Sequence, residues 1–283
     1  MNTATSQTPA GALFYLRQLV HGSTGIVLDG NKEYLFESRL SGILRQEGLA
    51  SFDALVTRLK VESAAAPLRQ RVVEAMTTNE TLFFRDNQPF DALRRTVLPN
   101  LATARAADRS LNLWSAASST GQELYSLAMT IKEQGPRFAG WNIKLMGTDI
   151  SSDVLARARA GRYSQLEVNR GLPAPMLVRH FEKVGTDWQI KDDLRQMCEF
   201  RTLNLIEAWP QLPRFDVVML RNVLIYFDVP TKRQILERIA NVMRPGGILF
   251  LGSVETTLNL TSRFAEIQHD KAMCYRVLAR GES

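Results

Sequence analysis

The chain has 283 residues, of which 45% are hydrophobic and 23% are charged, with a formal net charge of +6 and a pI of about 9.5. This composition is that of a globular protein with a sizeable core, and it excludes wholesale disorder. The two cysteines and three histidines have no metal-ligand spacing, no apolar run approaches a membrane helix, and no secretion signal opens the chain. We therefore expect a cytoplasmic protein without a metal site.

The first quarter of the chain predicts a small helical domain. Residues 1–10 are polar, and we expect them to be frayed. Apolar residues then recur at helical spacing, with Ser51 placed as an N-cap and Pro67 in the first turn of a later helix. We assign residues 1–75 to an all-helical domain and residues 76–109 to a linker with a connecting helix.

Apolar runs alternate with helical stretches over residues 110–283. The expected strands are LNLWSA (111–116), NIKLMGTDI (142–150), EFRTLNL (199–205), FDVVMLRN (215–222), ILFLGS (248–253) and a final pair, AEIQ and MCYRVLA. This alternation predicts a mostly parallel, doubly wound sheet. Residues 161–198 fit no strand–helix unit, so we interpret them as an insertion.

Ligands of open α/β sheets bind beyond the carboxyl ends of the strands. The first run leads into AASSTG (116–121), a loop of small side chains that lets a ligand approach the backbone. The second run ends in Asp149, whose carboxylate suits two ribose hydroxyls. The third ends in Asn204 and Leu205, an amide beside an apolar surface that suits an adenine ring.

Each strand end also has a structural interpretation. The small-residue loop suits a tight turn, Asp149 suits an N-cap, and asparagines such as Asn204 and Asn222 are usual turn residues. Four successive strand ends with suitable groups, the last being Arg221-Asn222, favour a nucleoside site. Neither GxGxxG nor GxxxxGK[ST] is present, so a nucleoside without a pyrophosphate, S-adenosylmethionine, is the expected cofactor.

Six segments occur in a characteristic order: TTNETLFFRD, WSAASSTGQELYSLAM, GTDIS, FRTLNL, FDVVMLRNVLIYFD and RPGGILFLGSVE. From about Phe14 to its end, the chain resembles the chemotaxis receptor methyltransferases, the CheR family. The most specific segments are NETLFFRD and RNVLIYF, which generic methyltransferases lack. The sequence departs from the family at Ser118 and Leu124, where cysteine and proline are usual.

The resemblance implies an α/β fold: a Rossmann-like class I S-adenosylmethionine-dependent methyltransferase sheet, a small N-terminal all-helical domain and a β-subdomain inserted at about 161–198. It implies methylation of glutamate side chains on the cytoplasmic signalling helices of chemoreceptors (MCPs). The products would be glutamyl methyl esters, formed in chemotaxis adaptation, and S-adenosyl-L-homocysteine.

The resemblance also implies the site residues. At matching positions the cofactor contacts are Asn79, Thr81, Arg85, Glu123, Asp149, Asn204, Leu205, Arg221 and Asn222. Arg85 and Tyr226 are implied as catalytic residues near the transferred methyl group, with Arg85 positioning the substrate carboxylate. A structural salt bridge from Arg85 to Glu123 or Asp86 is the alternative. TTNETLFFRD is predicted to be a lid whose adjacent phenylalanines pack beneath its polar groups.

The implied partner is the cytoplasmic domain of a chemoreceptor, and we expect a monomer that binds no nucleic acid and does not insert into the membrane. Residues 1–75 hold eight basic and seven acidic side chains, a balance of only +1, so a basic receptor-facing patch requires segregation. Arg39 and Arg45 are candidates for it. FEKVGTDWQIKDDL (181–194) is shorter than in members that bind a receptor-tail pentapeptide and keeps only Gly185, so we expect independence from that peptide.

Two other functions compete with this interpretation. A nucleic-acid methyltransferase, suggested by the basic pI, commonly has an Asn/Asp-Pro-Pro-aromatic motif for a flipped base, but the matching strand here ends in RNVLIYF. A catalytically silent S-adenosylmethionine-binding signalling module is the second alternative. Intact Arg85, Asp149, Asn222 and Tyr226 disfavour it.

Overall fold

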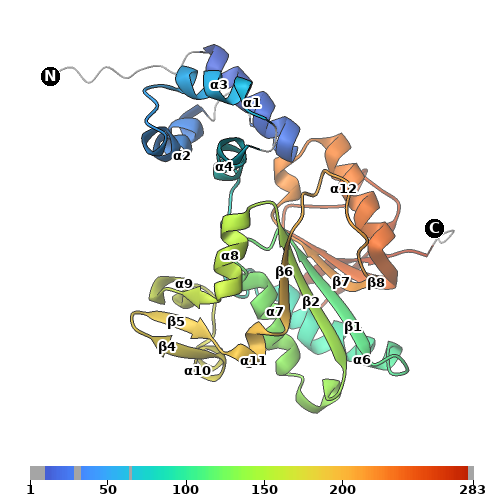
Figure 1. Cartoon of the computed structure of the whole chain (residues 1–283). Helices are drawn as coiled ribbons and strands as arrows, with labels where there is room; N and C mark the ends of the chain where they lie inside the picture. The colour runs from blue at the N-terminus through green and yellow to red at the C-terminus, as the bar shows by residue number, and fades with distance from the viewer. Residues whose placement is uncertain (1–9, 29–32, 64–65, 280–283) are drawn as a thin grey trace. The chain divides into compact units, whose positions relative to one another are not determined.

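The protein is described here by a computed structural model that covers residues 10–28, 33–63 and 66–279 (Figure 1). The chain divides into two compact units: one of residues 1–78 and 226–228, and one of residues 79–225 and 229–283. The expected fraying of residues 1–10 lies, apart from Ala10, outside the described residues.

The described part of the N-terminal unit is helical. It contains α1 (Ala10–Thr24), α2 (Glu33–Gln46), α3 (Phe52–Val61) and α4 (Pro67–Ala75). The Ser51 side chain caps α3 by accepting the Ala54 N–H at 3.2 Å, and Pro67 opens α4, both as predicted. Fully buried side chains from all four of these helices form its core, including Leu16, Phe36, Leu55 and Val72.

A short piece of the C-terminal half of the sequence belongs to this helical unit. The Val27 N–H donates to the Tyr226 carbonyl at 2.8 Å, and Ile26 forms an isolated antiparallel bridge with Phe227. His21 Nε2 lies 3.9 Å from the Asp228 carboxylate. This backbone pairing was not predicted, because the pattern around VLIYF suggests only a turn and core aromatics.

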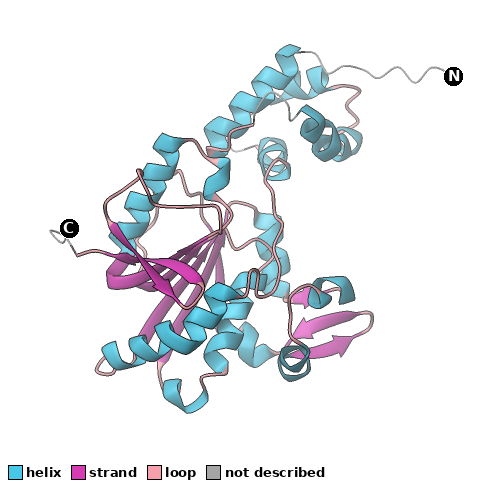
Figure 2. Ribbon diagram, turned by 180° about the vertical axis from the view of Figure 1, so that it is seen from behind, coloured by secondary structure: helices cyan, strands magenta, loops and turns pink. Residues whose placement is uncertain are grey.

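The second unit is built on a seven-stranded sheet, shown from behind in Figure 2. Its strands are β1 (Ser110–Ala116), β2 (Asn142–Asp149), β6 (Cys198–Thr202), β7 (Phe215–Leu220), β8 (Met243–Leu251), β9 (Phe264–His269) and β10 (Ala272–Val277). Their order is β6-β2-β1-β7-β8-β10-β9. The first five are parallel, and β10 is antiparallel to both its neighbours. This is the predicted Rossmann-like class I methyltransferase sheet.

Helices cover both faces of the sheet. The main helices here are α5 (Gln88–Ala92), the π-helix η2 (Leu93–Val97), α6 (Leu98–Ala104), α7 (Gln122–Lys132), α8 (Ser152–Ala160) and α12 (Val229–Val242). Two 3₁₀ turns, η3 (Gly135–Phe138) and η4 (Leu224–Tyr226), lie in the connections. Side chains alternate across a strand, and Val217 and Met219 of β7 share one core with α5 to α8. Val218 of β7 is also fully buried but does not belong to that core, and the same holds for Ile235 and Ile239 of α12. This places α12 on the other face of the sheet.

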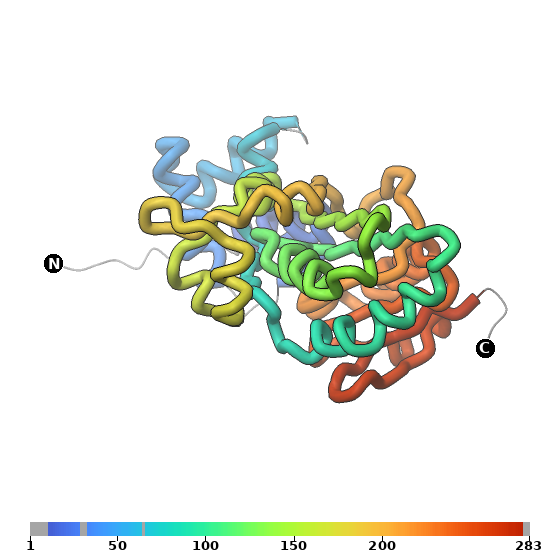
Figure 3. The backbone as a smooth tube through the Cα atoms, turned by 90° about the horizontal axis from the view of Figure 1, so that it is seen from below, coloured from blue at the N-terminus to red at the C-terminus, as the bar shows by residue number. Residues whose placement is uncertain are grey.

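Residues 162–195 form a small β-subdomain, as the resemblance implies. It comprises β3 (Arg162–Tyr163), α9 (Gln165–Asn169), α10 (Ala174–His180), β4 (Phe181–Val184), β5 (Asp187–Ile190) and α11 (Asp192–Arg195), with an antiparallel sheet in the order β3-β5-β4. Within the second unit, the subdomain and the red β9–β10 hairpin lie at opposite sides (Figure 3).

The two adjacent phenylalanines of TTNETLFFRD are both buried, as predicted. Phe83 packs edge-on against Tyr163 and Phe181, with ring centroids 5.0 and 5.6 Å apart. The Tyr163 hydroxyl in turn donates to the Thr120 carbonyl at 2.7 Å. These contacts join the β-subdomain to the loop that follows β1, so the apolar floor of this segment has a structural function.

Candidate active site

The loop after β1 has an unusual backbone. Ala117 and Ser119 have positive φ angles of 60° and 49°, and Gly121 has one of 94°. A Cβ atom on Gly121 would lie 2.9 Å from the Ala158 Cβ, so both conformation and space require glycine there. Positive φ costs a non-glycine residue about 1–3 kcal/mol, so the surrounding structure must hold this loop in place.

Asp149 provides part of that support. Its carboxylate accepts the Ser119 N–H at 2.9 Å with one oxygen and the Ser151 N–H at 3.0 Å with the other. The N-cap of α8 is Ser151 and not Asp149, which removes one structural alternative. The Asp149 carbonyl also accepts the Leu203 N–H at 2.9 Å. This side chain therefore links the ends of β1 and β2, and its backbone reaches the segment after β6.

Asn204 and Leu205 follow β6, as expected. The Asn204 amide oxygen accepts the Ile206 N–H at 3.2 Å, and its amide nitrogen donates to Glu207 at 3.0 Å. Trp209 donates to the Asn204 carbonyl at 3.2 Å, and Leu205 is buried. The asparagine thus shapes the local turn, and its contact with the adenine ring stays a prediction.

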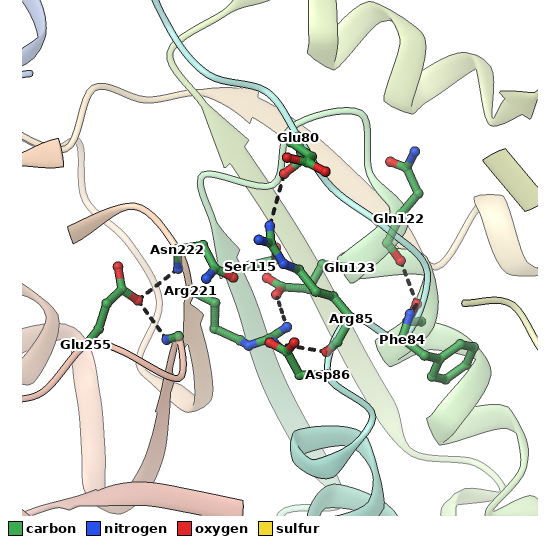
Figure 4. A network of polar contacts seen from close by, with 12 residues as sticks. Glu80, Phe84, Arg85, Asp86, Ser115, Gln122, Glu123, Arg221, Asn222 and Glu255 are labelled. Atoms are coloured by element: carbon green, nitrogen blue, oxygen red, sulfur yellow. Dashed lines mark hydrogen bonds and ion pairs between the residues drawn. The ribbon is translucent and has the colours of Figure 1, made fainter. Parts of the chain in front are cut away.

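Arg221 is the centre of a buried ion-pair network (Figure 4). It donates to Glu123 at 3.0 Å, to Asp86 at 2.6 Å and to the Arg85 carbonyl at 2.9 Å. The arginine side chain is 1% exposed, and the other Glu123 oxygen accepts the Ser115 hydroxyl at 2.8 Å. Three predicted site residues, Arg85, Glu123 and Arg221, are therefore brought together.

Arg85 itself does not form the salt bridge considered as its alternative role. Its guanidinium donates to the Glu80 carbonyl at 3.2 Å, while the carboxylates of Asp86 and Glu123 pair with Arg221. Among the described residues no ion pair of Arg85 is found. Within the described ranges, its remaining donors are therefore not bound to a carboxylate.

The segment from Asn79 to Asp86 is fixed on the sheet by backbone contacts. The Ser119 hydroxyl donates to the Asn79 carbonyl at 2.7 Å, and the Phe84 N–H donates to the Ser126 hydroxyl at 2.9 Å. Phe84 and Asp86 have positive φ angles of 50° and 66°. For a bulky residue such a conformation is an outlier, and outliers of this kind cluster at functional sites.

Glu255 is a site residue that sequence reasoning missed. Its buried carboxylate accepts the backbone N–H groups of Asn222 at 2.8 Å, Gly252 at 2.7 Å and Ile225 at 3.2 Å. Asn222 has a positive φ of 58°, and a Cβ on Gly252 would lie 2.7 Å from Glu255 Oε2. The available signal was the glutamate that closes RPGGILFLGSVE, three residues after a glycine.

Two cavities of the second unit flank this network. Asn79 and Thr81 line one of about 300 Å³ together with Thr120 and Gln122. Arg221 lines another of about 370 Å³. Tyr226 is the exception among the predicted residues, because its backbone belongs to the N-terminal unit, and its catalytic role stays a prediction.

The residues present fit S-adenosylmethionine. Ser118 lies in the small-residue loop, and its hydroxyl oxygen is buried without a hydrogen-bond partner, as expected beside a polar ligand. The neighbouring Asp149 carboxylate presents acceptors for hydroxyl groups. The serine at position 118, where the family usually has cysteine, therefore leaves a polar atom available in the loop.

Comparison with known proteins decides the family. Residues 79–273 match the family model described as "CheR methyltransferase, SAM binding domain", and residues 12–77 match "CheR methyltransferase, all-alpha domain". The chain belongs to the CheR methyltransferase family. S-adenosylmethionine is accordingly the cofactor of its second unit.

Curated relatives of this CheR-family chain match it over most of their lengths. "Chemotaxis protein methyltransferase 1" of Pseudomonas aeruginosa is 43% identical over 266 residues, which cover 92% of this chain and 95% of the relative. "Chemotaxis protein methyltransferase Cher2" of Pseudomonas putida is 39% identical, with coverages of 92% and 95%. A "Chemotaxis protein methyltransferase" of Vibrio parahaemolyticus is also 39% identical, with coverages of 92% and 94%.

Two features are absent from this CheR-family structure within residues 10–28, 33–63 and 66–279. No group of three or more His, Cys, Asp or Glu side chains there is arranged to hold a metal ion. No helix in the same ranges is long and apolar enough to cross a membrane.

Proposed function

We propose that this methyltransferase transfers the methyl group of S-adenosylmethionine to glutamate side chains on the cytoplasmic signalling helices of chemoreceptors. The names of the relatives support a role in chemotaxis. The observation that carries the choice of a carboxylate substrate is Arg85, a half-buried arginine beside the Arg221 network whose guanidinium contacts only a protein carbonyl among the described residues. A guanidinium fork matches a carboxylate in two-point geometry.

The proposed chemistry requires alignment and no general base. When bound, S-adenosylmethionine supplies a methyl group on a positively charged sulfur. A substrate carboxylate is already deprotonated at neutral pH, so no side chain of this protein would need to act as a base, and the residues of the site would only have to orient the carboxylate toward that methyl group. Opposite charges cancel on the way to the transition state, so a site that excludes water favours the reaction.

The protein's part is to hold the reacting atoms in line. Alignment of this kind supplies up to roughly 7–11 kcal/mol in favourable systems. We assign Arg85 to position the incoming carboxylate and Tyr226 to donate a hydrogen bond near the transferred methyl. We propose that the cofactor site is formed by Asn79, Thr81, Arg85, Glu123, Asp149, Asn204, Leu205, Arg221 and Asn222.

The receptor tail is not proposed to take part. The β4–β5 hairpin pairs Val184 with Asp187, so only Gly185 and Thr186 form its turn, and Gly185 has a positive φ of 62°. A two-residue turn supplies little surface for an additional peptide. We further propose that the enzyme is a cytoplasmic monomer.

The experiment uses tritiated S-adenosylmethionine with membranes that carry a chemoreceptor. A glutamyl methyl ester releases volatile label in base, whereas methylated nucleic acid and N-methylated protein retain it. We expect base-labile label on the receptor, equal in amount for a receptor truncated at its tail. Label on added DNA or RNA would support the nucleic-acid alternative, and binding of S-adenosylhomocysteine without any transfer would support the silent module.

A further inference from the structure

The second unit contains another cavity, of about 660 Å³, lined by four arginines: Arg105, Arg214, Arg244 and Arg263. It lies beside Met243, the first residue of β8, and Val277, the last residue of the antiparallel β10. It is therefore at the amino-terminal edge of the parallel strands, opposite the edge that carries Arg221. At about 3.3 Å per strand residue, the two edges are separated by roughly 17 Å along β7.

A buried aspartate orients two of these arginines. Asp216 is 0% exposed and accepts Arg105 Nε at 2.8 Å, while Arg244 Nε lies 3.6 Å from the same oxygen. The other Asp216 oxygen accepts the Asn112 N–H at 2.9 Å. The Arg244 Nε is buried without a hydrogen-bond partner, which is unusual for a buried donor.

The other two arginines are anchored to the end of α12. Arg214 donates through one terminal nitrogen to the carbonyls of Asn241 and Met243, the latter at 3.3 Å. Arg263 donates through one terminal nitrogen to the Asn241 side chain at 3.1 Å. Within the described part of the chain, the Nη2 atoms of Arg214 and Arg263 donate no hydrogen bond. The same is true of both terminal nitrogens of Arg105. The guanidinium groups of Arg105, Arg214 and Arg263 are thus each held by hydrogen bonds on one side and keep donors available on another.

The buried Asp216 offsets part of the charge of Arg105 and Arg244. The other nearby acidic groups do not cancel the remaining positive charge within the cavity. Glu237 lies 3.5 Å from Arg263 and Asp108 lies 3.9 Å from Arg244, but their side chains are 42% and 59% exposed and neither lines the cavity. Exposed pairs at such distances contribute little. The remaining lining is mostly aliphatic, with Pro245 and Leu278 among its residues.

We propose that this cavity is a binding site for a small phosphorylated molecule with two or more phosphate groups and an apolar remainder, such as a nucleoside di- or triphosphate. Planar guanidinium groups match phosphate oxygens in two-point geometry, and several arginines in one cavity suit more than one phosphate. The volume is within the usual range of about 300–1,000 Å³ for small-molecule sites. This site is separate from the one for S-adenosylmethionine and does not depend on the proposed substrate.

The test is isothermal titration calorimetry of the full chain with inorganic pyrophosphate and, separately, with ATP, which gives the dissociation constant of each probe. S-adenosylhomocysteine is present at saturation, so that ATP cannot occupy the cofactor site through its adenosine. The test variant is Arg244→Gln with Arg263→Gln, which leaves the buried Asp216 paired with Arg105. The matched control is Arg94→Gln with Arg95→Gln, which removes the same charge from side chains that are 46% and 63% exposed outside the cavity.

We expect both probes to bind the wild-type chain, ATP more tightly than pyrophosphate because of its apolar part, and both to weaken as salt rises. The test variant should weaken ATP at least 10-fold and the control less than 2-fold, with affinity for S-adenosylhomocysteine unchanged in both. Absence of binding to the wild type, or equal weakening by both variants, overturns the proposal. Equal competition by polyglutamate also overturns it, because charge alone would then explain binding. If the double variant loses S-adenosylhomocysteine binding, its fold is disturbed and the single variant Arg263→Gln replaces it. That single variant must then weaken ATP binding more than the control does, or the proposal is overturned.

Discussion

Arg221 and Glu123 form a buried ion pair of 3.0 Å between the residue after β7 and the first turn of α7. The guanidinium also binds Asp86 and the Arg85 carbonyl, so a single side chain connects the segment 79–86 to two elements of the sheet unit. Arg221 and Glu123 were both predicted as cofactor contacts. Their observed partners are protein groups, and they therefore act at least in part by shaping the site.

Breaking this pair is expected to destabilise the fold strongly. Arg221→Gln leaves the Glu123 carboxylate buried without a cationic partner, which typically costs about 3–5 kcal/mol. The free energy of unfolding in urea measures the effect. Arg201→Gln is the control, because its ion pair with Glu199 is exposed and such pairs contribute about 0–1 kcal/mol. Similar losses in both variants would show that Arg221 is not an essential link.

The sequence predicted the sheet because its central strands, such as β1 and β7, are short apolar runs that are buried on both faces. The β-subdomain and the buried Phe83 and Phe84 were also expected, on the basis of the family resemblance. The pairing of Tyr226–Asp228 with the N-terminal unit was not, since it joins residues about 200 positions apart through backbone groups. Local patterns contain no information about such a partner.

Within the site, residue types were easier to predict than their partners. Asp149 was expected as a ribose acceptor, but its oxygens also receive two backbone N–H groups. Arg39, considered for a receptor-facing patch, donates to the carbonyls of Met76 and Thr77 at 2.7 and 2.9 Å, and its place in such a patch stays a prediction. The connecting helix expected within residues 76–109 is interrupted by a π-helical turn at Leu93–Val97. Each of these outcomes depends on tertiary contacts.

Asp149→Asn is expected to weaken binding of S-adenosylhomocysteine by about 10-fold or more. The new amide carries N–H donors where the carboxylate has an acceptor, so one hydrogen bond is lost, either to the Ser119 or Ser151 N–H or to a hydroxyl of the ligand. A hydrogen bond to a charged group contributes about 1.5–3 kcal/mol. Calorimetry with S-adenosylhomocysteine gives the affinity. Asp153→Asn, at an exposed position in the first turn of α8, should bind as the wild type does. Unchanged affinity in Asp149→Asn would exclude this aspartate from the cofactor site.

Glu255→Gln is expected to destabilise the fold by about 1–3 kcal/mol, because one amide N–H would face backbone N–H donors that the carboxylate now accepts. The loss should be measurable as a lower urea midpoint with an unchanged slope. Asn222 is held by one of these bonds, so affinity for S-adenosylhomocysteine should fall as well. Glu266→Gln, exposed on β9, is the control and should change neither quantity. A variant as stable as the wild type would contradict the three-donor arrangement.

Arg85→Ala is expected to reduce methyl transfer by about 10- to 100-fold, the equivalent of a lost hydrogen bond to a charged group, while S-adenosylhomocysteine affinity falls much less. Single-turnover transfer to receptor membranes separates the two effects. Arg85→Lys should recover only part of the rate, because an ammonium group lacks the planar fork. Turnover equal to that of the wild type in Arg85→Ala would remove Arg85 from the catalytic assignment.

His180 is expected to make stability depend on pH. The side chain is buried at the end of α10, its Nε2 lies 3.5 Å from Glu133, and Arg179 binds the same carboxylate. Burial lowers the pKa of His180 below its usual value, although Glu133 opposes the shift and Arg179 adds to it. At pH values between the depressed pKa of the folded state and the ordinary value near 6.5, the unfolded chain therefore binds more protons than the folded chain.

The consequence is that stability should decrease as the pH falls below about 6.5 and should level off below the folded pKa. His180→Gln removes this component, so its free energy of unfolding should change less than that of the wild type between pH 7 and pH 5. His269→Gln, only partly buried on β9, is the control and should follow the wild type. Urea unfolding at closely spaced pH values provides the comparison. Parallel profiles for His180→Gln and the wild type would show that the buried histidine does not govern this dependence. Asp193, whose pKa is lowered by Lys132, loses its contribution to stability only at lower pH, as the pH falls through its depressed folded pKa.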